Sequence, residues 1–303
     1  MCMCVESVDY SVLVNNEVVG PIIPRRGLRQ GDPLSPYLFI ICVDGLSSLI
    51  RDVEERGIIS GVRVCWGVPS VSHLLFANDC FLFSKAEESQ DHVMKSILTV
   101  YEAASGQAIS LLKSEIYCSR NVPDPMKQNI TTILGVWAVL RTGKYLGLPS
   151  MIGRDRNSTF AYIKDRVWHK INSWSSKYLS KAGREIMIKS VLQAIPSYVM
   201  SIFLLPTNLI NTIEKMMNYL WWGHDRTSHR GINWLNWEKL SMHKVHGIMG
   251  FKDFIAFNLA MLRNQGWKFQ IEPNSLVSCI FRARYFPSQI YLTANISHNP
   301  SYV

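Results

Sequence analysis

Asn78 and Asp79 stand together in a short polar step, Phe76-Ala77-Asn78-Asp79, between two apolar runs. The runs at 71–76 and 80–83 predict two strands, and the residues between them predict a tight hairpin turn. A carboxylate at the rigid tip of a hairpin is a suitable oxygen ligand for a hard cation such as Mg²⁺. Asn and Asp are also favoured in such turns for purely conformational reasons, so the segment alone does not establish a metal site.

The elements around this turn predict an α+β domain over the first 120 residues. Alternating apolar residues at 5–24 predict a hairpin that turns at Asn15-Asn16-Glu17. Helical spacing predicts helices over 36–54 and 87–105, with Ser35 as the expected cap of the first and Gly106 as the end of the second. Residues 109–118 predict a further strand.

The residues after 155 predict a helical region. One apolar face recurs at helical spacing through Phe160, Ile163, Val167, Ile171, Trp174 and Tyr178. Two more helices are expected over 184–194, which Pro196 would end or kink, and over 208–221. The tryptophan-rich residues 221–269 predict short helices and loops. These tryptophans could stack bases, but at such spacings they more often belong to a core.

The net charge of +9 is unevenly distributed. Residues 1–100 contain 8 Lys and Arg against 12 Asp and Glu, whereas residues 101–303 contain 24 against 11. The densest basic segment is 141–189, with 11 basic and 3 acidic residues. A basic face suits phosphate backbones, and a solvated lysine-rich surface would explain the same composition.

The composition disfavours several other classes of protein. The seven cysteines are scattered and contain no CxxC pair or zinc-like cluster, so we expect reduced structural thiols. No run of 18 apolar residues and no signal peptide is evident, which favours the nucleus or cytoplasm.

The loop before the hairpin turn resembles a known family. It reads Arg26-Gly27-Leu28-Arg29-Gln30-Gly31-Asp32-Pro33-Leu34-Ser35-Pro36 and is similar to a segment of reverse transcriptases from plant non-LTR (LINE-type) retrotransposons. In that family a Gly-rich loop and the following helix contact the template and the incoming nucleotide. The resemblance implies such contacts here, because glycines let nucleic acid approach the backbone and the polar side chains donate hydrogen bonds. The residues concerned are Arg26, Gly27, Arg29, Gln30 and Gly31.

Further segments resemble the family in the same order. The family has Phe or Tyr, Ala, Asp, Asp in its catalytic hairpin, which implies catalytic positions at Asn78 and Asp79 and a Mg²⁺ ligand at Asp79. The segment 106–114 is similar to the next motif, in which Lys113 would lie near the triphosphate and act as a general acid. The segment 144–150 resembles the primer-grip turn, which implies contact with the primer at Tyr145, Leu146 and Gly147.

The remaining chain resembles the thumb and connector of plant LINE elements. The thumb-like segments are 166–168, 179–185 and 193–196, and the connector-like segments are 221–223 and 250–253. The resemblance implies an antiparallel right-hand polymerase palm, in part, at 1–119, a bridging segment at 120–150, a helical thumb at 151–222 and a connector at 223–303. An RNA template and a DNA primer would be the partners, with their backbones contacted by Lys164, Lys170, Lys177 and Lys181.

Two departures from the family bear on catalysis. Asn78 stands where the family has the first Asp of its pair, and an amide offers a metal ion a carbonyl oxygen without charge. The family's other catalytic Asp lies on a palm strand before the loop, which we expect to be absent together with the fingers. No local motif supports Asp9 as its replacement, so Asp79 is the one metal-site carboxylate that clearly matches.

Three interpretations remain open from the sequence. The chain is a polymerase fragment without activity, a module that binds nucleic acid through 141–189, or a relic with no selected function. In the last case an incomplete palm would leave sheet edges and apolar faces uncovered.

Overall fold

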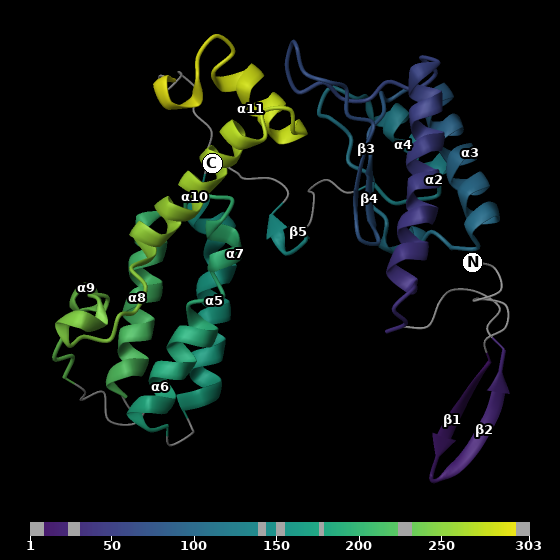
Figure 1. Ribbon diagram of the computed structural model, residues 1–303. Helices are drawn as coiled ribbons and strands as arrows, with labels where there is room; N and C mark the ends of the chain where they lie inside the picture. The colour runs from purple at the N-terminus through teal and green to yellow at the C-terminus, as the bar shows by residue number, and fades with distance from the viewer. Residues whose placement is uncertain are drawn as a thin grey trace. The chain divides into compact units, whose positions relative to one another are not determined.

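The chain divides into two compact units, unit 1 (Met1–Arg141) and unit 2 (Thr142–Val303). The computed structural model describes residues 9–23, 31–138, 144–149, 155–175, 179–223 and 232–294 (Figure 1). The described part of unit 1 contains, in chain order, β1 (Tyr10–Val14), β2 (Glu17–Ile22), α2 (Ser35–Glu55), β3 (His73–Phe76), β4 (Asp79–Leu82), α3 (Glu88–Ser105), the 3-10 helix η1 (Leu111–Lys113) and α4 (Asp124–Leu134).

Unit 2 is mainly helical. Its described elements are β5 (Lys144–Tyr145), β6 (Leu148–Pro149), α5 (Arg156–Ser175), α6 (Lys181–Met187), the π-helical turn η2 (Ile188–Leu192), α7 (Ser197–Met200), α8 (Thr207–Trp222), α9 (Trp237–Leu240), η3 (Lys244–His246), α10 (Phe254–Ile271), α11 (Leu276–Tyr285) and η4 (Tyr291–Thr293). Among the described helices, none is long and apolar enough to cross a membrane.

The strands form three separate antiparallel hairpins. β1 pairs with β2, β3 with β4 and β5 with β6, and no ladder between described residues joins one pair to another. The predicted α+β class is confirmed. The single antiparallel sheet expected of a palm is not formed by the described residues, because each strand finds its partner across its own short turn.

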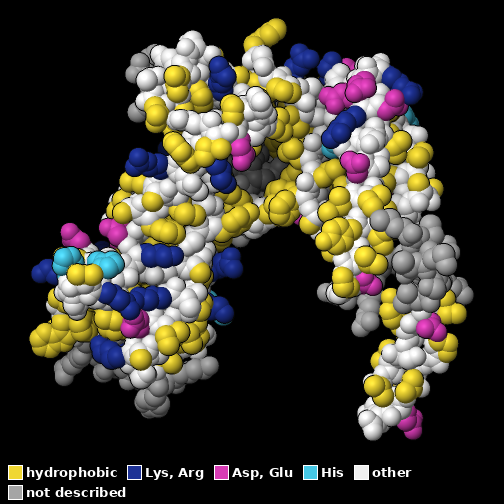
Figure 2. Space-filling model, viewed as in Figure 1, with side chains coloured by type: hydrophobic (Ala, Val, Ile, Leu, Met, Phe, Trp, Pro, Cys, Tyr) yellow, Lys and Arg dark blue, Asp and Glu magenta, His cyan; other side chains and the backbone are white. Residues whose placement is uncertain are grey.

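The first hairpin turns where it was predicted to turn. Val14 pairs with Glu17, and Asn15 and Asn16 have φ angles of +50° and +70°. Positive φ at both central residues is what a two-residue type I′ turn requires, and Asn tolerates it. Apolar side chains on both strands are exposed, as Figure 2 shows: Val12, Leu13, Val14, Val18, Val19 and Ile22.

The core of unit 1 lies between α2 and α3. Leu46 and Ile50 of α2 pack with Met94, Ile97 and Tyr101 of α3, and all five are less than a tenth exposed. Both predicted helices are confirmed to within one residue at each end. α3 ends as expected at a glycine in the left-handed conformation.

Ser35 is the first residue of α2 and does not cap it. The helix is instead preceded by Asp32, whose Oδ1 accepts a hydrogen bond of 2.8 Å from the backbone N–H of Leu34. The carbonyl of Asp32 also accepts a bond from the backbone N–H of Ser35. Pro36 fits the first turn, because its fixed φ suits a helix start.

The strand predicted over 109–118 is wrong. Residues Leu111–Lys113 form η1, and Ile116 makes only an isolated bridge with Ala138. Local bonds stabilise the turn: the Ser114 hydroxyl and the Lys113 backbone N–H both donate to the carbonyl of Ser110. A serine that bonds to nearby backbone offers the chain an alternative to a strand.

The core of unit 2 lies between α5 and α8, which run side by side in Figure 1. The face of α5 predicted from its spacing is confirmed at Phe160, Ile163, Val167 and Ile171, which are each at most 1% exposed. Trp174 is partly buried against the same core, and Tyr178 lies outside the described residues. Burial of such a side chain contributes roughly 2 kcal/mol. The matching side chains on α8 include Ile213 and Met217.

The segment after α8 contains a long helix that was not predicted. α10 has 18 residues and is capped at its N-terminus by Asp253, whose side chain accepts a hydrogen bond from the Ala256 backbone N–H. Its N-terminal part is fixed by Asn258, the fifth residue of the helix, which is fully buried. The Asn258 Oδ1 accepts from the Leu205 N–H at 2.9 Å, and Nδ2 donates to the carbonyls of Met200 and Phe203 at 2.8 and 2.9 Å.

Candidate functional site

The hairpin β3–β4 presents the predicted acidic turn. Phe76 pairs with Asp79, so Ala77 and Asn78 are the two turn residues and Asp79 begins β4. Ala77 has a φ of +48°, a conformation that costs a residue with a side chain roughly 1–2 kcal/mol. The side chains of Asn78 and Asp79 are exposed. The turn therefore presents one carboxylate and one amide to solvent.

A histidine attaches this hairpin to α2. His73, the first residue of β3, has Nε2 at 2.8 Å from the Ser47 hydroxyl of α2 and Nδ1 at 3.1 Å from the Ser72 hydroxyl. Burial lowers the pKa of His73 below its ordinary value of 6.5; Arg51 lowers it further, and Glu54 opposes this. The neutral ring is thus favoured. Sequence reasoning missed this contact, because no local motif links residues 26 positions apart.

A mostly apolar pocket of about 570 Å³ lies between α2 and the turn. Leu75 and Ala77 line it from the hairpin, and Asp44, Ser47 and Arg51 are its polar residues from α2. The hydrogen bond between Ser47 and His73 therefore fixes one wall of the pocket relative to the turn.

The donors at the turn fit a divalent ion poorly. Two-metal nucleotidyl transfer needs several negative oxygen ligands, because hard cations depend on charged oxygens. Here Asp79 is accompanied by neutral Asn78. Within the described ranges no group of three or more His, Cys, Asp or Glu side chains is placed to hold a metal ion.

The other catalytic and template positions are spread along unit 1. Lys113 is exposed on η1, and no hydrogen bond or ion pair between described residues connects it with Asp79. Gly31 lies in the turn before α2 with a φ of +89°. The predicted template residues Arg26, Gly27, Arg29 and Gln30 lie outside the described residues.

The primer-grip-like residues form the hairpin β5–β6. Tyr145 pairs with Leu148, and Leu146 and Gly147 have φ angles of +50° and +78°, as a type I′ turn requires. The Tyr162 hydroxyl of α5 donates to the carbonyl of Gly147 at 3.3 Å. Leu148 packs against the core of unit 2, so the turn is attached to α5.

The four predicted backbone-contacting lysines have different surroundings. Lys164 lies 3.9 Å from the carboxylate of Asp165. Lys170 is exposed on α5, and Lys177 lies outside the described residues. The amine of Lys181 lies over the rings of Trp221 and Trp222, at 4.8 and 4.6 Å from their centres. Among the three described lysines, only Lys170 thus contacts neither an acidic side chain nor an aromatic ring.

Together the fold and the site define an α+β protein with an Asn-Asp hairpin turn mounted on a long helix. Residues 3–150 match the family described as reverse transcriptase (RNA-dependent DNA polymerase). Residues 3–150 therefore belong to the reverse transcriptase family. The matched region includes the described elements of unit 1 and the hairpin β5–β6.

The chain is also similar to several plant proteins. An uncharacterized mitochondrial protein of Arabidopsis thaliana is 52% identical over 67 residues, which are 22% of the chain and 55% of that relative. A putative ribonuclease H protein of the same plant is 29% identical over 143 residues, 47% of the chain and 23% of the relative. A second uncharacterized mitochondrial protein is 34% identical over 110 residues, 36% of the chain and 71% of the relative. The chain thus spans about half of the first relative and a quarter of the second.

Proposed function

We propose that the chain is a fragment of a LINE-type retrotransposon reverse transcriptase that no longer catalyses DNA synthesis. Residues 1–119 correspond to part of the palm, 120–150 to a bridging segment, 151–222 to the thumb and 223–303 to the connector. The family membership of residues 3–150 and the order of the motifs along the chain support this proposal.

The asparagine at position 78 is the observation from which we infer the loss of activity. It occupies the position of a family carboxylate beside Asp79, and it is exposed at a turn with one remaining acid. Replacing a carboxylate by an amide removes a full negative charge from a site whose ligands must offset a divalent cation. Mg²⁺ would then be held too weakly to activate a primer hydroxyl.

Primer extension on an RNA template, with Mg²⁺ or Mn²⁺, tests this proposal. We expect no templated product from the full chain. A product that depends on the template and disappears in Asp79→Ala would contradict the proposal, because it would show a working metal site at this turn.

A second function, binding of nucleic acid, is favoured by the charge of unit 2. Residues 142–303 contain 20 Lys and Arg against 8 Asp and Glu, and Figure 2 shows Lys and Arg side chains spread over this unit. Lys170 and Arg166 are exposed on α5. Such a surface binds phosphates without needing the catalytic turn.

Binding of a labelled RNA–DNA hybrid at several salt concentrations tests the second function. The logarithm of the affinity is expected to fall linearly with the logarithm of the salt concentration, because binding releases counterions. A chain that binds no RNA, DNA or hybrid at low salt, although it is folded, would contradict this function.

A further inference from the structure

We propose that the outward face of α10 binds an amphipathic helix of another protein, and that this partner helix carries a carboxylate among the apolar residues of its contact face. The surface concerned, called the α10 ridge below, consists of Ile255, Leu259, Arg263, Trp267 and Ile271. The inference is independent of the functions proposed above, because it concerns a different class of partner from a nucleic acid.

The inward face of α10 is already occupied, and this fixes which side of the helix faces outward. Phe254 and Asn258 are fully buried, and Phe257 packs against the core of unit 2. Asn258 makes its three hydrogen bonds to backbone groups of residues 200–205, and the Gln265 side chain donates to the carbonyl of Ser201 at 3.1 Å. The helix therefore cannot turn its outward residues into the core of unit 2.

The outward residues have the shape of a helix-packing surface. The five residues of the α10 ridge follow one another at intervals of four and extend over about 24 Å of the helix. Such rows form the ridges that fit into the groove of a second helix, most often at a crossing angle of about −50°. Ala256 and Ala260 are exposed beside the row and leave room for the ridge of a partner.

The α10 ridge is large, apolar and uncovered. Its four apolar side chains, those of Ile255, Leu259, Trp267 and Ile271, are between 41% and 61% exposed. Single exposed apolar residues are ordinary on protein surfaces, but a continuous row of them marks a surface that binds another protein. Covering this row would remove apolar area from water over most of the length of α10.

The charge at the middle of the ridge specifies the partner further. Arg263 is exposed, and no carboxylate among the described residues lies within ion-pair distance of it. α10 contains Arg263 and Lys268 but no Asp or Glu. A cation that is covered without a counter-charge loses its hydration and gains nothing in return. A helix that covers the ridge must therefore bring a carboxylate to Arg263.

A second copy of the chain does not meet this requirement. A symmetric contact between two copies is made by the same patch on each. The ridge extends eight residues to either side of Arg263, so two ridges centred on each other would bring the two Arg263 side chains together. Like charges at the centre of an apolar contact disfavour that pairing, which leaves a different, acidic partner.

Fluorescence anisotropy of the full chain with labelled helical peptides tests the inference. The Glu peptide has about 20 residues, with Leu at every fourth position, Glu at the central place of that row, and Ala and Gln elsewhere. The Lys peptide has Lys in place of the Glu. We expect the Glu peptide to bind and the Lys peptide to bind about tenfold more weakly, because only the first offers Arg263 a counter-charge.

Variants of the ridge locate the binding. Arg263→Glu is expected to reverse the preference, so that this variant binds the Lys peptide about tenfold more tightly than the Glu peptide. Leu259→Gln keeps a good helix former at an exposed position and is expected to weaken the binding of either peptide about tenfold, because apolar contact is lost. Thermal unfolding of each variant establishes that it is folded.

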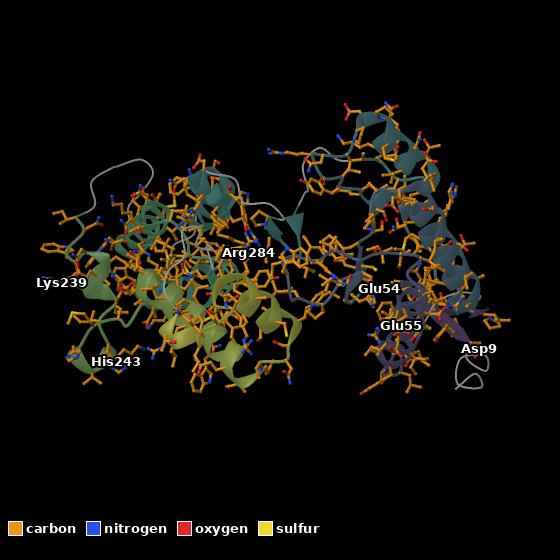
Figure 3. The ribbon with its side chains drawn as sticks, turned by 90° about the horizontal axis from the view of Figure 1, so that it is seen from above. Asp9, Glu54, Glu55, Lys239, His243 and Arg284 are labelled. Atoms are coloured by element: carbon orange, nitrogen blue, oxygen red, sulfur yellow. The ribbon has the colours of Figure 1, made fainter. Side chains whose placement is uncertain are left out.

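Lys239→Glu and Ile186→Gln are the matched controls for charge and for apolar contact. Lys239 is exposed on α9, and Ile186 is exposed on α6. Figure 3 shows Lys239 and His243 on another part of unit 2 from Arg284, which lies on α11, and α11 packs against α10. Both control variants are expected to bind the peptides like the unaltered chain.

Four results would overturn the inference. The first is that neither peptide binds, and the second is that both bind equally well. The third is that unlabelled oligonucleotide displaces the Glu peptide as well as unlabelled Glu peptide does, because the ridge would then be a nucleic-acid surface. The fourth is a dimer of the unaltered chain in sedimentation that Leu259→Gln dissociates, because a second copy would then cover the ridge.

Discussion

The side-chain amine of Lys181 lies 4.6 Å from the centre of the Trp222 ring and 4.8 Å from that of Trp221. Burial and the nearby Arg184 lower the pKa of Lys181. A lysine held over two rings at the end of α8 joins α6 to α8. The sequence predicted that this lysine contacts phosphates. We infer that its main role is to stabilise the fold of unit 2.

Replacement of this lysine tests that inference. Lys181→Met keeps most of the aliphatic stem and removes the charge, so the cation–π contacts are lost. We expect the free energy of unfolding to fall by about 1 kcal/mol, measured by urea denaturation. Lys170→Met, the same change at an exposed position of α5, is expected to leave stability unchanged and to weaken nucleic-acid binding. Equal stabilities of the two variants would contradict a structural role for Lys181.

Two glycines with similar backbones should respond differently to alanine. Gly223 and Gly247 have φ angles of +71° and +74°, so both substitutions incur the same backbone cost. A Cβ at Gly223 would overlap the Arg184 guanidinium, whereas one at Gly247 would meet open space. Arg184 would have to leave the carbonyl of Trp221 at the end of α8. We expect Gly223→Ala to lose about 1 kcal/mol more than Gly247→Ala in urea denaturation, and equal losses would argue against this contact.

The His73 contact predicts a pH dependence for unit 1. Because the folded-state pKa of His73 lies below 6.5, the folded chain binds fewer protons than the unfolded chain as the pH falls. The contribution to stability is therefore complete above pH 6.5 and is lost progressively below it. His73→Gln should flatten this dependence in denaturation experiments from neutral pH to about pH 5. His92→Gln, at an exposed position of α3, is the control and should leave the dependence in place.

Restoring an acid at the turn should restore part of the metal affinity. Asn78→Asp places two carboxylates side by side, and we expect Mn²⁺ affinity, measured by electron paramagnetic resonance, to rise about tenfold. Primer extension should remain undetectable, since the described residues supply no group of three acidic or other metal ligands there. Asn16→Asp, which places an acid beside Glu17 in the β1–β2 turn, is the matched control. An equal gain in that variant would show that position 78 has no special geometry.

Removal of the buried amide of α10 should be the most damaging of these changes. Asn258→Leu leaves the N–H of Leu205 and the carbonyls of Met200 and Phe203 without their partner. We expect a loss on the order of 3 kcal/mol in the free energy of unfolding. Asn211→Leu at an exposed position of α8 is the control and should change stability little.

Sequence reasoning succeeded where a short stretch of chain determines its own structure. The face of α5, the paired asparagines of the first turn and the glycine that ends α3 each act within a few residues. It failed over 109–118, where serine–backbone bonds replace a strand. It also missed α10, because the apolar residues of this helix do not gather on one face and so lack the helical spacing from which a helix is recognised.

In the candidate site, too, local structure was predicted and contacts between distant residues were not. The turn at Ala77 and Asn78 was predicted from neighbouring residues, but its attachment to α2 through His73 and Ser47 depends on distant parts of the chain. The number of lysines identified the basic region, but it could not show which of their amines are free to bind a phosphate.

The buried amide of α10 also sets an order of events during protein synthesis. Asn258 is translated 53 residues after Leu205, which at ordinary rates of elongation is roughly 3–10 seconds later. During that interval α8 is synthesised, and Met200, Phe203 and Leu205 still lack the side chain that satisfies one interior backbone group of each. Unit 2 can therefore reach its native state only after the chain has been translated past α10, and a nascent chain that stalls earlier should be a preferred client of chaperones.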